Sequence, residues 1–185
     1  MAMLLVALLC GCGSHTDGES IRAHFEALEG FEAQIEITAD LGESVLDFSI
    51  QYDYNKEDND RFTITAPESL AGISGTIAGT DNAVFSLQYD GLALDDAMPQ
   101  RTGLTPADAL FCLMNDLRTA QPAQIWQESA SGTDYIVVRY EGEDADGTVA
   151  KQVWLTKQGL QPAYAELYAD GSRVIAIRVA SFTET

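Results

Sequence analysis

The chain has 185 residues, enough for one domain with a sizeable core, and its 46% apolar and 21% charged residues are ordinary for a globular protein. Its charge is unusual, because 10 Lys and Arg face 29 Asp and Glu, for a formal net charge of -19. A surface this acidic repels nucleic-acid phosphates and anionic lipid headgroups. We therefore exclude nucleic acid as a partner and membrane adsorption by charge alone.

An apolar run at the start of the chain ends in Leu9-Cys10-Gly11-Cys12. Ala2 to Leu9 is too short to span a bilayer but has the size of a signal-peptide core. Its ending resembles the bacterial lipobox, whose last cysteine is lipidated and becomes the first residue after cleavage. The resemblance implies that residues 1–11 are a cleaved signal peptide. It also implies that Cys12 carries a diacylglyceryl group, a membrane anchor, and that residues 12–19 are a flexible tether.

A metal or redox site at Cys10 and Cys12 is one alternative, and a buried first strand or helix is another. The chain has three cysteines and two histidines, His15 and His24. A structural zinc site needs two separated cysteine pairs or additional histidine ligands. We therefore expect no metal and no cofactor. A buried first strand or helix, the other alternative, would leave the Cys-Gly-Cys ending unexplained.

The domain, residues 20–185, is predicted to open with a short helix over Ser20–Glu29. Ser20 can cap it, and Ile21, Phe25 and Leu28 share its apolar face. Apolar residues then recur at every second position, which indicates strands with one apolar face and one solvent-exposed face. The strands predicted in this half of the chain are 31–41, 44–54, 61–65, 72–78 and 83–89.

Strands continue in the second half, separated by turns rich in Gly and Asp. We predict them at 123–128, 134–140, 149–156, 163–168 and 173–182. About ten antiparallel strands at near-regular spacing fit one large curved sheet or an open barrel. The acidic side chains then fall on its outer face.

One helix interrupts the strands, in "TPADALFCLMNDLRTA". Thr105 is its expected cap, and Cys112 is expected on its polar side, together with Asp108. The helix should lie across the concave face of the sheet. Its wide apolar stripe is formed by Leu110, Phe111, Leu113, Met114 and Leu117. The loop before it, 90–103, is either a flap over a site or a plain connector.

No motif of known chemistry is present in the sequence. It lacks a phosphate-binding loop, an HExxH pair and a nucleophile elbow. "GEDADG" fails as a calcium loop, since Gly142 and Val153 occupy two essential ligand positions. Paired carboxylates could serve acid–base chemistry, but nothing distinguishes any pair. We therefore name no catalytic residue and expect no enzyme.

The order of lipobox, tether, helix, strands, central helix and further strands resembles the LolA/LolB superfamily. The likeness is carried by "APESLAGISGTIAG", "LQYDGLAL", "LTPADAL" and "VWLTKQGLQPAYAELY". The chain looks most like the LolA-like lipoproteins of Gram-positive bacteria, of which the germination lipoprotein GerS is typical. The resemblance implies a mostly-β fold, in which one curved antiparallel sheet forms an incomplete β-barrel whose interior is covered by helices.

Two functional hypotheses remain open. In the first, the protein is a lipid-anchored, extracytoplasmic accessory module that binds an envelope protein, as GerS supports a peptidoglycan amidase. In the second, it is a tethered receptor, like LolB, whose cavity holds an acyl chain or another apolar ligand. The residues that would line this cavity, or form an ordinary core beneath the helix, are Ile35, Ile37, Phe48, Ile50, Phe62, Ile64, Phe85 and Leu87.

Overall fold

The computed structural model describes residues 17–40, 42–78, 84–94, 101 and 103–185. Cys12, the predicted signal peptide of residues 1–11 and most of the predicted tether lie outside this range, as does much of the loop 90–103. Among the described residues, no helix combines the length and the apolar character needed to cross a bilayer.

A single antiparallel sheet of eleven strands dominates the fold. Its strands run in the order β6-β5-β4-β3-β2-β1-β11-β10-β9-β8-β7, so the first strand of the chain pairs with the last. Within the described residues, β6 and β7 end the sheet and do not pair with each other, which leaves the barrel open. The strand bounds are β1 Gly30–Asp40, β2 Val45–Asn55, β3 Asp60–Ala66, β4 Ser74–Ala78, β5 Val84–Tyr89, β6 Leu92–Leu94, β7 Gln124–Ala130, β8 Thr133–Asp144, β9 Gly147–Thr156, β10 Pro162–Ala169 and β11 Ser172–Glu184.

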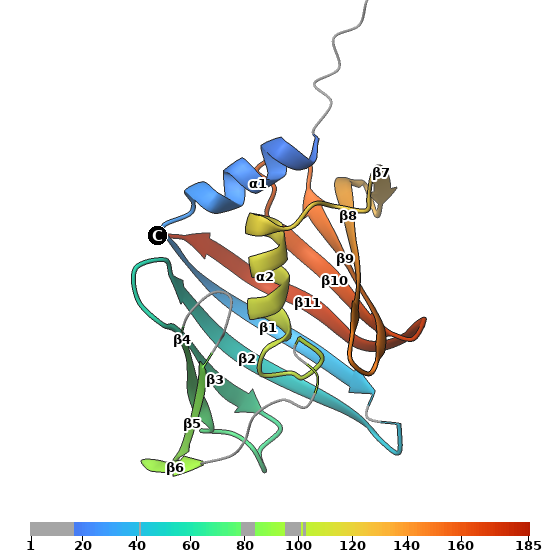
Figure 1. Ribbon diagram of the computed structural model, residues 1–185. Coiled ribbons are helices and arrows are strands. Elements are labelled where there is room, and N and C mark those ends of the chain that lie inside the picture. The colour runs from blue at the N-terminus through green and yellow to red at the C-terminus, as the bar shows by residue number, and fades with distance from the viewer. Residues whose placement is uncertain (1–16, 41, 79–83, 95–100, 102) are drawn as a thin grey trace, which may run out of the picture.

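Two helices cover the sheet on one side. Helix α2 (Ala109–Thr119) lies across the concave face, and α1 (Gly18–Ala27) lies across one end of it (Figure 1). The alternation predicted for β1 is confirmed, since its inward side chains are buried and its outward ones are exposed. The predicted mostly-β, incomplete barrel with a helix on its concave face is therefore confirmed.

The start of α1 differs from the prediction. Asp17, not Ser20, caps the helix, because the Asp17 carboxylate accepts a hydrogen bond from the Ser20 amide at 2.9 Å. The Ser20 hydroxyl donates back to the Asp17 carbonyl oxygen at 2.9 Å. These bonds lower the pKa of Asp17. Both residue types are good caps, so the sequence alone did not separate them.

Candidate functional site

The eight predicted lining residues all come from strands of one half of the sheet, β1 to β3 and β5. Six of them are buried to 7% exposure or less, and Phe85 and Leu87 on β5 are half-buried. All eight pack in or against one hydrophobic cluster that includes the helix α2. The structure thus brings the predicted residues together on the concave face.

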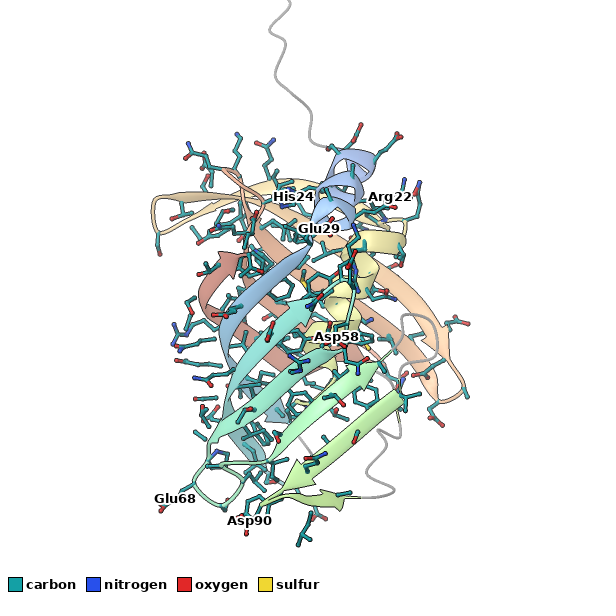
Figure 2. All side chains as sticks on the ribbon, turned by 90° about the vertical axis from the view of Figure 1, so that its left-hand side faces the viewer. Arg22, His24, Glu29, Asp58, Glu68 and Asp90 are labelled. Carbon is teal, nitrogen blue, oxygen red and sulfur yellow. The ribbon has the colours of Figure 1, made fainter. Side chains whose placement is uncertain are left out.

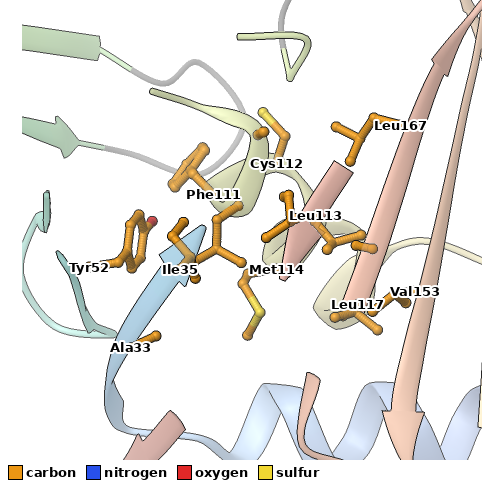
Figure 3. Packing of buried hydrophobic residues seen from close by; sticks show 14 of the residues in the cluster. Ala33, Ile35, Tyr52, Phe111, Cys112, Leu113, Met114, Leu117, Val153 and Leu167 are labelled. Carbon is orange, nitrogen blue, oxygen red and sulfur yellow. The ribbon is translucent and has the colours of Figure 1, made fainter. Parts of the chain in front are cut away.

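Helix α2 supplies the other side of this cluster. Leu113, Met114 and Leu117 are exposed by 2% or less, and they lie among the side chains of the sheet (Figure 3). The Phe111 ring meets the Phe85 ring edge-on, with centroids 6.4 Å apart. The apolar stripe predicted for this helix is confirmed, and its side chains fill the space in which an acyl chain would have to lie.

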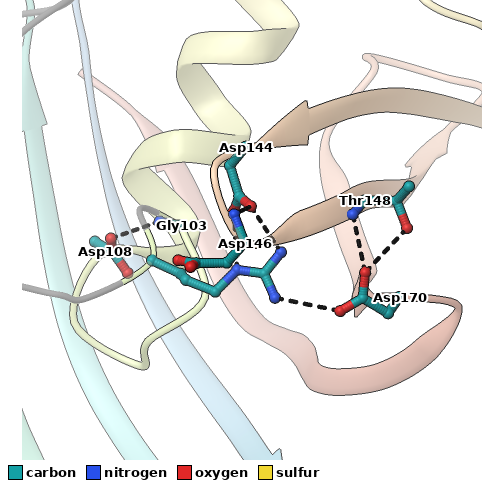
Figure 4. A network of polar contacts seen from close by, with 7 residues as sticks. Gly103, Asp108, Asp144, Asp146, Thr148 and Asp170 are labelled. Atoms are coloured by element: carbon teal, nitrogen blue, oxygen red, sulfur yellow. Dashed lines mark hydrogen bonds and ion pairs between the residues drawn. The ribbon is translucent and has the colours of Figure 1, made fainter.

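The N-terminus of α2 is held differently from the prediction. Thr105 does not cap the helix, which begins only at Ala109. Instead the buried Asp108 carboxylate accepts a hydrogen bond from the Gly103 amide at 2.6 Å (Figure 4). It also accepts from the Thr105 hydroxyl at 2.6 Å and from the Thr105 amide at 3.0 Å. Burial raises the pKa of Asp108. Asp108 was expected on the polar side and is instead a buried anchor of the turn.

The Cys112 thiol is buried, so the prediction that Cys112 lies on the polar side of the helix is wrong. The physical reason is the turn before α2, which covers this side of the helix. Gly103 adopts a φ of +80°, and a Cβ atom added there would lie 3.0 Å from the Cβ of Cys112. A side chain at Gly103 would therefore be strained by both its backbone and its neighbour.

We expect the Cys112 thiol to be unreactive in the folded protein. Burial raises its pKa to about 12, so the nucleophilic thiolate does not form near neutral pH. In a chain beginning at Ser14, Cys112 is the only cysteine. A thiol reagent such as DTNB should give no signal in native buffer and one thiol per chain in urea. A Ser129→Cys variant, whose new thiol is exposed, should react at once; rapid native labelling of the parent chain would contradict the prediction.

An ion pair fixes the turn before α2 to the sheet. Arg101 donates two hydrogen bonds to Asp144, at 2.9 and 3.0 Å, and lies 3.6 Å from Asp170 (Figure 4). Its guanidinium lowers the pKa of the Asp144 carboxyl. On the other flank, the Lys151 ammonium of β9 pairs with Asp116 of α2 at 2.6 Å. Helix α2 is thus tied to strands of the sheet by charge as well as by packing.

Sequence reasoning missed a buried polar group at the end of the concave face. Asp60, at the start of β3, is 4% exposed and accepts a hydrogen bond from the Tyr52 hydroxyl of β2. Nearby, Arg118 of α2 donates to the Tyr54 hydroxyl, and its guanidinium lies 4.7 Å from the centre of that ring. Burial raises the pKa of Asp60 to about 6. The alternation of β3 could have revealed it, because Asp60 falls on the same inward face of the strand as Phe62 and Ile64.

The described polar groups of this region are mostly buried and bonded to neighbouring side chains. Asp60 is enclosed among side chains, and Cys112 lacks an activated thiolate. No three His, Cys, Asp or Glu side chains converge as metal ligands do, within the part of the chain that the structure describes. Helix α2 is positioned by the Lys151–Asp116 pair, by the Arg118–Tyr54 hydrogen bond and by the Asp108 turn.

No family model matches the sequence, and no curated protein matches it. Similar solved structures include a LolA superfamily protein from Nitrosomonas europaea, with 14% identity, a TM-score of 0.46 and coverage of 92% of this chain and 94% of that one. LprF from Mycobacterium bovis has 8% identity, a TM-score of 0.48 and coverage of 89% and 90%.

A chain in the structure of the CwlD amidase from Clostridioides difficile in complex with the GerS lipoprotein is also similar. It has 11% identity, a TM-score of 0.36 and coverage of 90% of this chain and 89% of that one. LolA superfamily proteins are thus among the solved structures similar to this chain, as its sequence predicted. The architecture itself is established by the strand order and the place of α2 on the concave face.

Proposed function

We propose that the protein is a lipid-anchored, non-enzymatic module of the cell envelope, whose domain works by binding another envelope protein. One observation carries this proposal: α2 fills the concave face. Leu113, Met114 and Leu117 occupy the space between the helix and the sheet, where a carrier would hold its ligand. The surface is then the part of the domain left for recognition. A peptidoglycan-modifying amidase is the partner that the resemblance to GerS implies.

The lipobox motif supports the anchored location at the extracytoplasmic face of the membrane. Gly13 to Thr16 alone separate Cys12 from Asp17, the cap of α1. Covalent geometry therefore keeps the Cα atom of Asp17 within roughly 18 Å of the Cα atom of Cys12. The end of the domain that carries α1 would then face the membrane, and the end that carries Glu68 and Asp90 would point away from it (Figure 2).

We expect Cys12 to be the site of acylation. Metabolic labelling of cells with an alkyne analogue of palmitate should mark the wild-type protein, and Cys12→Ala should remove the label and release the domain from membranes. Cys10→Ala is the matched control and should still be labelled, because Cys10 belongs to the cleaved segment. Equal labelling of the wild type and Cys12→Ala would disprove the anchor.

A second function, binding of an apolar ligand, is favoured by one observation. Phe85 and Leu87, two of the eight predicted lining residues, are only half-buried on β5. An acyl chain bound by this protein would therefore lie near β5, beside Phe111 at the start of α2. Native mass spectrometry of a chain beginning at Ser14 tests this alternative, since a retained lipid would support it and a bare protein would not.

A further inference from the structure

The convex face of the sheet carries one continuous row of large side chains. Each member lies directly opposite the next in the strand register. With adjacent strands about 4.8 Å apart, the row is roughly 24 Å long and runs from the free edge at β7 to the middle of the sheet. This aromatic row consists of Trp126, Val137, Trp154, Tyr164, Arg178 and Glu36.

The aromatic row is not an ordinary solvated surface. Val137 is 0% exposed, yet it stands outside the hydrophobic core, because it faces away from α2. Its direct neighbours on the two adjacent strands are Trp126 and Trp154. These are the only tryptophans of the sequence, and both are partly exposed. The convex face therefore has an apolar centre of its own.

Hydrogen bonds and ion pairs hold the rings of this region in place. The Glu166 carboxylate accepts from the hydroxyls of Tyr164 and Tyr168, and Arg173 pairs with the same carboxylate at 2.6 Å. The Arg139 guanidinium lies 5.6 Å from the centre of the Tyr168 ring. Side chains that are fixed before binding lose little conformational entropy when a partner arrives. The surface is thus pre-organised for binding.

A hollow adjoins the row beside Tyr164. Its volume is about 410 Å³, and Arg173 and Arg178 form part of its wall. Val45, at the start of β2, also lines it and is 60% exposed, so the hollow offers apolar as well as charged contacts. An apolar side chain of another protein can enter such a hollow and pack against Val45 and the alkyl stems of the two arginines.

We propose that the aromatic row and its hollow form the surface by which the domain binds its protein partner, an envelope protein with an apolar centre and a basic rim. The proposal rests on the function proposed above. Trp, Tyr and Arg dominate the residues that carry binding energy at protein interfaces. The formal net charge of -19 favours a basic partner, and Glu128, whose carboxylate accepts a hydrogen bond from the Trp154 ring, adds negative charge beside the row.

Ring geometry favours a protein over a glycan. The rings of Trp154 and Tyr164 are 5.2 Å apart and tilted by 55°. They do not form one plane on which the flat faces of successive sugars could stack. An uneven surface of this kind can pack closely against the side chains of another protein, as in the fully packed centre of a protein interface.

Photo-crosslinking in cells tests the proposal with the full-length, anchored protein. A benzoylphenylalanine residue replaces Trp126 or Arg178 in the row, and Arg61 or Glu68 elsewhere on the surface. We expect the two row positions to give an adduct with the same envelope protein, and the other two positions to give none. Adducts at equal yield from Arg61 and Glu68 would overturn the proposal, as would an adduct with a second copy of this chain.

Substitutions then test whether the row supplies affinity. Arg178→Ala should reduce the adduct formed from position 126 by about tenfold or more, as truncation of a dominant interface residue does. Arg61→Ala is a matched control, since Arg61 and Arg178 are 58% and 59% exposed and each pairs with one carboxylate. This control should leave the adduct unchanged. Equal yields from the two variants would show that the row supplies no affinity.

Tryptophan fluorescence tests the glycan alternative directly, because both tryptophans lie in the row. We expect chitohexaose, an oligomer of N-acetylglucosamine, to leave the emission of the purified protein unchanged. A saturable change would assign the row to glycan instead of protein. An adduct from Arg61 or Glu68 alone would overturn the proposal for the row and leave the proposed function standing. No adduct from any position would count against both.

Discussion

Replacing Leu117 with alanine will lower the free energy of unfolding by about 2–5 kcal/mol. Leu117 is 0% exposed and belongs to the cluster that joins α2 to the sheet. Its truncation removes buried apolar surface and leaves a cavity that the surrounding strands cannot fully close. Urea denaturation of a chain beginning at Ser14, followed by circular dichroism, measures the change.

Leu92→Ala is the matched control for this prediction, because Leu92 is 71% exposed on β6. It should change the free energy of unfolding by about 0.5 kcal/mol or less. A loss of similar size in both variants would show that Leu117 does not pack in a filled core.

The same variant distinguishes a filled core from a ligand cavity. In the wild type, α2 occupies the concave face, so a fluorescent apolar probe should find no room beneath the helix. Leu117→Ala opens an apolar space, and dry cavities of this kind bind small apolar molecules. We therefore expect the variant to bind the probe and the wild type not to. Tight binding to the wild type would favour the receptor-like hypothesis.

The features predicted well from sequence are those that show as a repeating pattern of apolar residues within one strand or helix. Alternation in β1 was enough to assign its faces, because a half-buried strand needs an apolar residue at every second position. The apolar stripe of α2 was visible for the same reason. Strand β6, with three residues, is too short to show a period and was missed.

The features that the sequence did not reveal depend on contacts between distant segments. Cys112 was placed on a polar side because helical periodicity assumes one covered face, whereas the turn at Gly103 covers a second. The contact of Asp60 with Tyr52 depends on how β3 and β2 pair. Likewise, Trp126, Trp154 and Tyr164 become one row only through the register of four strands. Such contacts require the register of the sheet as well as its pattern.

Asp60 makes the stability of the domain depend on pH in the direction opposite to that of a carboxylate held by a salt bridge. Burial raises the pKa of its carboxyl from 3.8 to about 6, and the Tyr52 hydrogen bond and Arg118 only partly offset this. Between these two values the folded chain keeps a proton that the unfolded chain has lost. The contribution of Asp60 to stability therefore falls as the pH rises through this window. Above it, the folded state holds a buried charge at a cost of about 3 kcal/mol.

Asp60→Asn should remove this dependence, because an amide does not ionise but can still accept a hydrogen bond from Tyr52. Relative to the wild type, the variant should gain about 3 kcal/mol in its free energy of unfolding between pH 4 and pH 7. Urea denaturation of both chains at intervals across this range measures the gain. A difference between the two chains that stays constant with pH would show that Asp60 does not titrate in the folded state.

Asp144→Asn is a control of opposite sign. Arg101 lowers the pKa of Asp144, so the stabilising effect of this carboxylate is present at neutral pH and is lost as the pH falls. Relative to the wild type, the Asp144→Asn variant should become less stable as the pH rises, whereas Asp60→Asn becomes more stable. Because the two carboxylates have opposite effects, a general change in net charge cannot produce both results. Opposite slopes would therefore assign the pH dependence to the buried position of Asp60 beneath α2.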